Sequence, residues 1–85
     1  MDVEHLIQMA NQIGQFHESL PDHAAALNGT ASHIRRFWDP RMRRALLAHV
    51  DQHHGEGLDP LVLEAITSNR AMLEPPAAPQ PGRPA

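Results

Sequence analysis

The 85-residue chain contains no cysteine, no lysine and no tyrosine, and its only aromatic side chains besides histidine are two phenylalanines and one tryptophan. Without cysteine it can form no disulfide and can offer no thiolate to a zinc ion or an iron–sulfur cluster. Without lysine, every fixed positive side-chain charge is a guanidinium, the group suited to bidentate contacts with carboxylates and to stacking on aromatic rings. These absences exclude disulfide-stabilised folds and cysteine-based metal or redox sites.

Long apolar runs are absent as well. No segment approaches the ~20 apolar residues that a membrane helix needs. The acidic start, residues 1–4, lacks the basic and apolar regions of a signal peptide. We therefore expect a cytoplasmic protein that does not enter a membrane.

Proline is concentrated at the C-terminal end. Residues 75–85 hold five of the eight prolines and no valine, isoleucine, leucine or aromatic residue. We expect one folded domain over residues 2–73 and a disordered, Pro-rich tail over residues 74–85. A core of this size rarely supplies more than about 3–5 kcal/mol, so a binding partner would add to a small stability.

Apolar residues recur at helical spacing in the first segment, from Asp2 to about Leu20. One stripe is formed by Leu6, Met9, Ile13, Phe16 and Leu20. A second stripe of smaller residues, which includes Gly14, lies beside it and makes the apolar arc wider than a contact between two helices needs. Because glycine inside a helix costs about 1 kcal/mol relative to alanine, Gly14 predicts a close approach by another element. Internal helix packing and contact with a partner both fit.

Two Asp-Pro pairs predict helix starts. Proline suits the first helical position, and the aspartate before it can cap the free amides of the first turn. The second helix is expected from Asp22 to Trp38, either continuous or split in two at Asn28-Gly29-Thr30. The third is expected from Pro40 to about His54 with Gly55 as its stop, and the fourth from Pro60 to about Leu73. The sequence thus predicts an all-α fold, a small bundle of about four short helices with a disordered tail.

The junction between the second and third predicted helices carries the most unusual composition. Residues 35–44 hold five of the seven arginines against one aspartate, in a chain whose net charge is −3. Phe37 and Trp38 lie between these arginines, and both core packing and an interface anchor fit the two aromatic rings. The arginines fit a solvated surface or a docking site for acidic side chains. A helix-turn-helix that binds nucleic acid is a remote alternative, because the acidic net charge and the absence of lysine disfavour it.

Other chemistry has weak support. His49 and His53 have the four-residue spacing of two helical metal ligands, but zinc sites use three or four protein ligands, and the last turn of a helix is an ordinary place for histidine. None of the serines lies in a nucleophile elbow, and no glycine-rich phosphate loop occurs. We therefore expect no catalytic residue, no cofactor-binding residue and no metal site in this chain.

Three blocks of sequence together resemble one known family, the delta subunit of NAD-dependent formate dehydrogenase. The blocks are Met9-Ala10-Asn11-Gln12-Ile13-Gly14-Gln15-Phe16, then His33-Ile34-Arg35-Arg36-Phe37-Trp38-Asp39-Pro40-Arg41-Met42-Arg43, then Leu58-Asp59-Pro60-Leu61-Val62. Their order and spacing agree with the family over about residues 3–73, and the middle block is the most specific. The Pro-rich end lies outside the resemblance.

The resemblance implies an accessory, non-catalytic subunit that helps assemble or stabilise a cytoplasmic molybdenum enzyme, which oxidises formate to carbon dioxide and reduces NAD. The complex it implies carries molybdopterin, iron–sulfur clusters and FMN in other subunits, and the large catalytic subunit is the expected partner. A dissociable chaperone or regulator of molybdenum cofactor insertion is the alternative. The residues predicted to contact the partner are Arg35, Arg36, Phe37, Trp38, Arg41, Arg43 and Arg44, with Asn11, Gln12 and Gly14 from the first helix.

Overall fold

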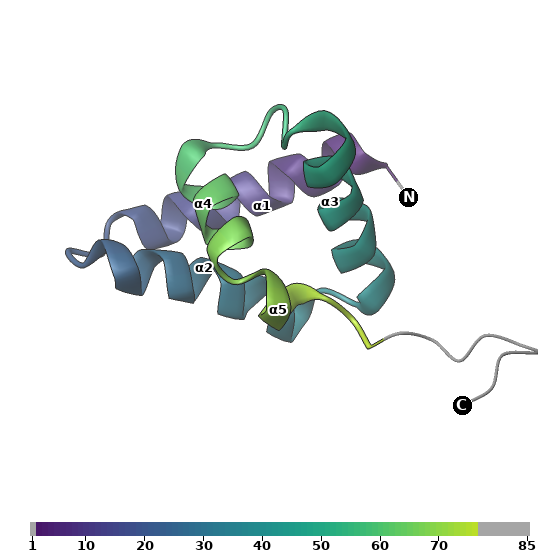
Figure 1. Ribbon diagram of the computed structural model, residues 1–85. Helices are drawn as coiled ribbons and strands as arrows, with labels where there is room; N and C mark the ends of the chain where they lie inside the picture. The colour runs from purple at the N-terminus through teal and green to yellow at the C-terminus, as the bar shows by residue number, and fades with distance from the viewer. Residues whose placement is uncertain (1, 77–85) are drawn as a thin grey trace, which may run out of the picture.

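The computed structural model describes residues 2–76, which form helices connected by short loops (Figure 1). The helices are α1 (Val3–Glu18), α2 (His23–Phe37), α3 (Pro40–His53), α4 (Pro60–Ser68) and the single turn α5 (Arg70–Leu73). No strand occurs among residues 2–76. The predicted all-α fold is confirmed, with the fourth predicted helix divided at Asn69 into α4 and α5. The tail predicted over residues 74–85 lies, from residue 77 onward, outside the described residues.

Aspartate caps begin the first three helices. A carboxylate oxygen of Asp2 accepts a hydrogen bond from the amide of Glu4, Asp22 does the same for Ala24, and Asp39 for Met42, at 3.0–3.1 Å. Each bond satisfies one of the amides that the first turn leaves without a partner in the helix. The helix start predicted at Asp39-Pro40 is confirmed in position and in cap.

The fourth helix begins at Pro60 as predicted, but its cap differs. The side chain of Asp59 makes no capping hydrogen bond. Instead, the Asp59 amide donates to Oδ1 of Asn11 at 2.8 Å, and Nδ2 of Asn11 donates to the carbonyl of Gly57 at 3.0 Å. One amide side chain of α1 therefore holds the loop between α3 and α4.

The structure decides between the two alternatives for the second helix and shifts the predicted end of the third helix slightly. The second helix is continuous through Gly29, so the split that the sequence allowed at residues 28–30 does not occur. A Cβ on Gly29 would lie 2.5 Å from Cδ2 of His17, which shows that this glycine lets α1 come close to α2. The third helix ends at His53, and His54 rather than Gly55 is its first left-handed residue, with φ of 57°.

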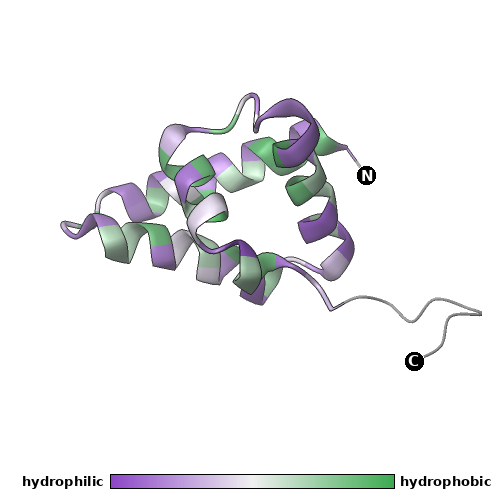
Figure 2. Ribbon diagram, viewed as in Figure 1, coloured by the Kyte–Doolittle hydropathy of each residue, from purple (hydrophilic) through white to green (hydrophobic). Residues whose placement is uncertain are grey.

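Helices α1 and α2 form an antiparallel hairpin, and α3, α4 and α5 close the bundle around it (Figure 1). Hydrophobic and hydrophilic positions alternate along the helices, as Figure 2 shows, and the hydrophobic positions of all five helices meet in one core. The buried cluster consists of Leu6, Ala10, Ile34, Trp38, Leu46, Leu47, Val62, Ile66 and Leu73. Apolar burial of this kind is the main source of stability for so short a chain.

The first apolar stripe is only partly in the core. Leu6 is buried and Met9 and Ile13 pack partly against the cluster, but Phe16 is 76% exposed and Leu20 is 42% exposed. The second, smaller stripe supplies the closer packing, because Ala10 and Gly14 are both buried. Internal packing thus uses the smaller stripe, where Gly14 meets Val62 of α4, while Phe16 and Leu20 of the first stripe remain exposed.

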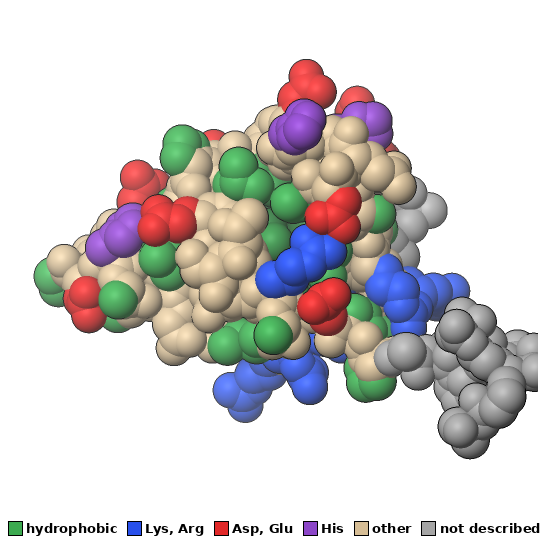
Figure 3. All heavy atoms as spheres, viewed as in Figure 1, with side chains coloured by type: hydrophobic (Ala, Val, Ile, Leu, Met, Phe, Trp, Pro, Cys, Tyr) green, Lys and Arg blue, Asp and Glu red, His purple; other side chains and the backbone are tan. Residues whose placement is uncertain are grey.

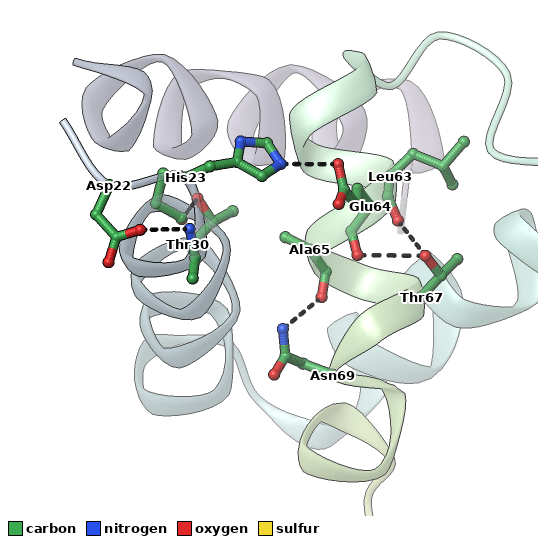
Figure 4. A network of polar contacts seen from close by, with 10 residues as sticks. Asp22, His23, Thr30, Leu63, Glu64, Ala65, Thr67 and Asn69 are labelled. Atoms are coloured by element: carbon green, nitrogen blue, oxygen red, sulfur yellow. Dashed lines mark hydrogen bonds and ion pairs between the residues drawn. The ribbon is translucent and has the colours of Figure 1, made fainter. Parts of the chain in front are cut away.

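Polar contacts join the hairpin to α4 and support α4 itself (Figure 4). His23 at the start of α2 and Glu64 in α4 point toward one another, with 3.0 Å between Nε2 and Oε1. Thr67 and Asn69 return their side chains to carbonyl oxygens of the preceding turn. These hydrogen bonds stabilise the end of α4, where the chain turns into α5.

No helix within residues 2–76 combines the length and the apolar character that crossing a membrane requires.

Candidate functional site

The site begins with the corner at which α2 ends and α3 starts. The amide of Trp38 still donates to the carbonyl of Ile34 at 3.0 Å, and Asp39 then caps α3. Trp38 is only 5% exposed and belongs to the core, whereas its neighbour Phe37 is 65% exposed. The two aromatic residues therefore have different places: Trp38 fixes the corner from inside and Phe37 projects from it.

Four of the five arginines of this corner, Arg35, Arg36, Arg41 and Arg44, are exposed. Within residues 2–76, Arg70 is the arginine that forms ion pairs, with Asp51 and Glu74, and none of these four does so. On the face seen in Figure 3, basic side chains gather along the edge below α2 and at the end where α3 begins. The corner therefore presents positive charge that the described part of the chain does not neutralise.

Arg43 is the fifth arginine and lies inside the bundle, 4% exposed. Its Nη1 donates to the carbonyl oxygen of Leu73 at 3.3 Å, while its Nε has no hydrogen-bond partner among the described residues. Burial, followed by repulsion from Arg35 and Arg44, lowers the pKa of the Arg43 guanidinium. Arg43 thus serves the fold by holding α5 against α3, and its burial removes it from the surface that we predicted.

A groove of about 460 Å³ lies beside the corner, between α1, α2 and the first turn of α3. Its lining is mostly apolar and aromatic. The lining residues are Met9, Gln12, Ile13, Phe16, His17, His33, Phe37, Trp38 and Met42. Phe16 and Phe37, two of the three large exposed hydrophobic side chains among the described residues, therefore border the same depression.

Rings from α1 and α2 meet along this groove. Phe16 and His17 contact edge to face, His17 lies 6.3 Å from His33, and His33 lies 4.6 Å from Phe37, measured between ring centroids. Nδ1 of His17 is 2.9 Å from the carbonyl oxygen of Ile13, so this nitrogen is the one that carries the proton in the hydrogen bond. The guanidinium of Arg36 lies over the Phe37 ring, with 5.5 Å between Cζ and the centroid.

Of the three residues of α1 predicted to contact a partner, one lines the groove and two make contacts within the chain. Gln12 is exposed and lines the groove. Asn11 binds the loop before α4, and Gly14 is buried where a Cβ would collide with Cγ2 of Val62. The close approach that Gly14 predicts is therefore made by α4 of the same chain, the internal alternative.

His49 and His53 have the spacing of two helical metal ligands, and their contacts in the structure are as follows. The rings of His49 and His53 lie 5.5 Å apart, and Nε2 of His49 is 2.7 Å from the carbonyl oxygen of Glu56. Within the described residues, no group of three or more histidine, aspartate or glutamate side chains is placed to hold a metal ion. These histidines carry structural contacts at the end of α3.

Three of the nine residues that line the groove, Gln12, Phe37 and Trp38, are among the predicted partner contacts. Phe16, Met9, Ile13, His17, His33 and Met42 were not among the predicted contacts. For the four of these residues that lie on α1, the available signal was the width of the apolar arc on the first helix, which exceeds what its internal packing uses.

Comparison with known protein families gives one match. The family described as NADH-dependent formate dehydrogenase delta subunit FdsD matches residues 5–66, which include the hairpin, the arginine corner and most of α4. Comparisons with curated proteins and with solved structures find no match. The matched segment spans well over half of the chain, and the chain therefore belongs to the family of NADH-dependent formate dehydrogenase delta subunits.

Proposed function

We propose that this protein is a non-catalytic accessory subunit that binds a cytoplasmic, NAD-dependent formate dehydrogenase and helps assemble or stabilise it. The observation that carries the proposal is the surface around the α2–α3 corner, which lies within the segment that matches the family. This surface carries exposed arginines without ion-pair partners in residues 2–76 and two exposed phenylalanines. Neither feature is needed by the fold of the single chain, and a partner would make use of both.

A binding role also suits the chemistry that the chain can offer. Without cysteine it cannot supply thiolates to iron–sulfur clusters, so the clusters of the complex would be held by other subunits. The molybdenum centre and FMN belong, in this proposal, to those subunits as well. The large catalytic subunit is the proposed partner.

The test is expression of the enzyme subunits with and without this chain. We expect the chain to remain in the active complex through size-exclusion chromatography, and its omission to lower the yield or the thermal stability of that complex. Equal yield and stability without the chain, or its separation from the complex, would contradict the proposal.

Measuring the molybdenum content of the same preparations distinguishes an accessory subunit from a factor that acts on cofactor insertion. A dissociable chaperone or regulator of cofactor insertion would be absent from the active complex, and its omission would lower the molybdenum content. A permanent accessory subunit is instead recovered with the enzyme in a fixed ratio.

A further inference from the structure

The groove beside the corner is an apolar surface that the described chain leaves uncovered. Phe16 is 76% exposed and Phe37 is 65% exposed, although residues of this type are usually buried. Phe16 follows Gly14 by two positions, about 200° around the helix, so it points away from the side of α1 that α4 covers. The exposed edge of the groove at Phe16 therefore lies on a different face of α1 from the one that α4 covers.

The shape of this surface favours an elongated occupant. On α1 the apolar positions of the lining run from Met9 through Ile13 to Phe16, which is about 10 Å at 1.5 Å per residue. His33 and Phe37 of the antiparallel α2 form the other side. A helix of about two turns fits a seam of this length between two helices, as in helix-in-groove recognition.

A small ligand fits this surface less well. Ligand pockets close around their ligand and direct several polar groups toward it. Here the two phenylalanines project outward, and Nδ1 of His17 is already bonded to the carbonyl of Ile13. Projecting aromatic side chains beside an arginine are typical of contacts between proteins.

The positive charge beside the groove indicates that the polar face of the occupant carries acidic side chains. The guanidinium of Arg36 lies over the Phe37 ring, and Arg41 directly precedes Met42 of the lining; both arginines are exposed. Neither forms an ion pair within residues 2–76. Aspartate or glutamate beside the apolar stripe of the occupant would pair with these guanidiniums.

A second copy of this chain is disfavoured by the same charges. A symmetric contact places the same surface of both copies face to face. That arrangement would bring the two sets of arginines together, and like charges at close range repel.

We propose that the groove formed by Phe16, His33, Phe37 and Met42 binds an amphipathic helix of another formate dehydrogenase subunit, whose carboxylates pair with Arg36 and Arg41. This inference rests on the proposed function and assigns that function a contact surface and a partner chemistry. The exposed positions of the groove carry binding, and the buried Trp38 holds the groove in shape.

Photo-crosslinking within the co-expressed complex tests the inference. A benzophenone amino acid replaces Phe37 in one full-length variant and the exposed Thr67 of α4 in a control, and mass spectrometry identifies the linked peptides. We expect position 37, and not position 67, to link to a helical segment of another subunit that bears acidic residues beside an apolar stripe. Linkage of position 37 to a second copy of this chain, or to a segment without acidic residues, would overturn the inference.

Substitutions measure the contribution of the groove. The double variant F16S/F37S and the charge reversal R36E alter exposed side chains, so the fold is retained, which circular dichroism checks. Each is expected to weaken retention in the complex about tenfold or more, while Gln52→Glu on the outer face of α3 has no effect. If wild type is retained and F16S/F37S is retained equally, the groove assignment fails and the accessory function stands. If wild type itself is not retained, the proposed function fails.

Discussion

Nη1 of Arg43 donates a hydrogen bond of 3.3 Å to the carbonyl oxygen of Leu73, thirty residues later in the chain. This contact joins the first turn of α3 to the end of α5 inside the bundle. Arg44, the next residue after Arg43, is exposed and makes no ion pair within residues 2–76. Two adjacent arginines therefore belong to different parts of the protein, one to the fold and one to its surface.

Substitution of Arg43 is expected to affect stability, and substitution of Arg44 is not. Arg43→Ala removes a buried side chain and leaves the Leu73 carbonyl without its donor, which should cost about 2–4 kcal/mol of unfolding free energy. Arg43→Met fills most of the volume without a buried charge and should cost less than Arg43→Ala. Arg44→Ala should stay within about 0.5 kcal/mol of wild type. Urea unfolding measures all three, and equal losses for Arg43→Ala and Arg44→Ala would contradict the assignment.

Asp51 gives the protein one predictable dependence on pH. Two hydrogen bonds from Arg70, at 2.7 and 2.8 Å, lower the pKa of the Asp51 carboxyl. Because the pKa is lower in the folded state than in the unfolded chain, the contribution of this group is present above the unfolded pKa, about 4, and is lost as the pH falls through the folded value.

The corresponding variant is Asp51→Asn, which keeps the shape and removes the charge. Comparison of melting temperatures at pH 7 and pH 3 should show a larger fall for wild type than for Asp51→Asn. Both side chains are in contact with solvent, 36% exposed for Arg70 and 53% for Asp51, so the difference should be small and should decrease in high salt. An equal fall for both proteins would contradict a favourable contact between Asp51 and Arg70.

Gly14 is predicted to be required by packing within the chain. Alanine at this position gains about 1 kcal/mol of helix propensity, but its Cβ would collide with Cγ2 of the fully buried Val62. We expect a net loss of about 1–2 kcal/mol for Gly14→Ala, measured by thermal unfolding. In a Val62→Ala background the same substitution should be neutral or stabilising. A penalty of the same size in both backgrounds would show that α4 is not the element that Gly14 accommodates.

Local sequence signals predicted the helices well because their physical causes are local. Proline at positions 40 and 60 fixes helix starts, and Asp39 caps the amide of Met42 as expected. The cap of α4 could not be predicted in this way, since Asp59 is bound by Asn11 from a distant helix. The sequence could not decide whether α2 continues through Gly29 for the same reason, because the contact that requires a glycine there is made by His17 of α1.

The candidate site was predicted less completely. The sequence marks where arginines and aromatic rings gather, but it does not say which of two adjacent side chains points inward. Trp38 and Arg43 lie in the interior, while Phe37 and Arg44 lie at the surface. Phe16 belongs to the larger apolar stripe of the first helix and is nevertheless exposed, while α4 packs against the helix at Gly14, in the smaller stripe.

Hydroxyl-radical footprinting of the chain, alone and in the purified formate dehydrogenase complex, tests whether the groove beside the α2–α3 corner is covered by a partner subunit. Phenylalanine, methionine and histidine side chains are oxidised in proportion to their exposure, and His53 and His54 at the far end of α3 serve as controls. We expect strong protection of Phe16, Phe37 and Met42 in the complex, with little change at the two histidines. Unchanged oxidation of Phe16 and Phe37, with protection confined to another surface, would contradict it.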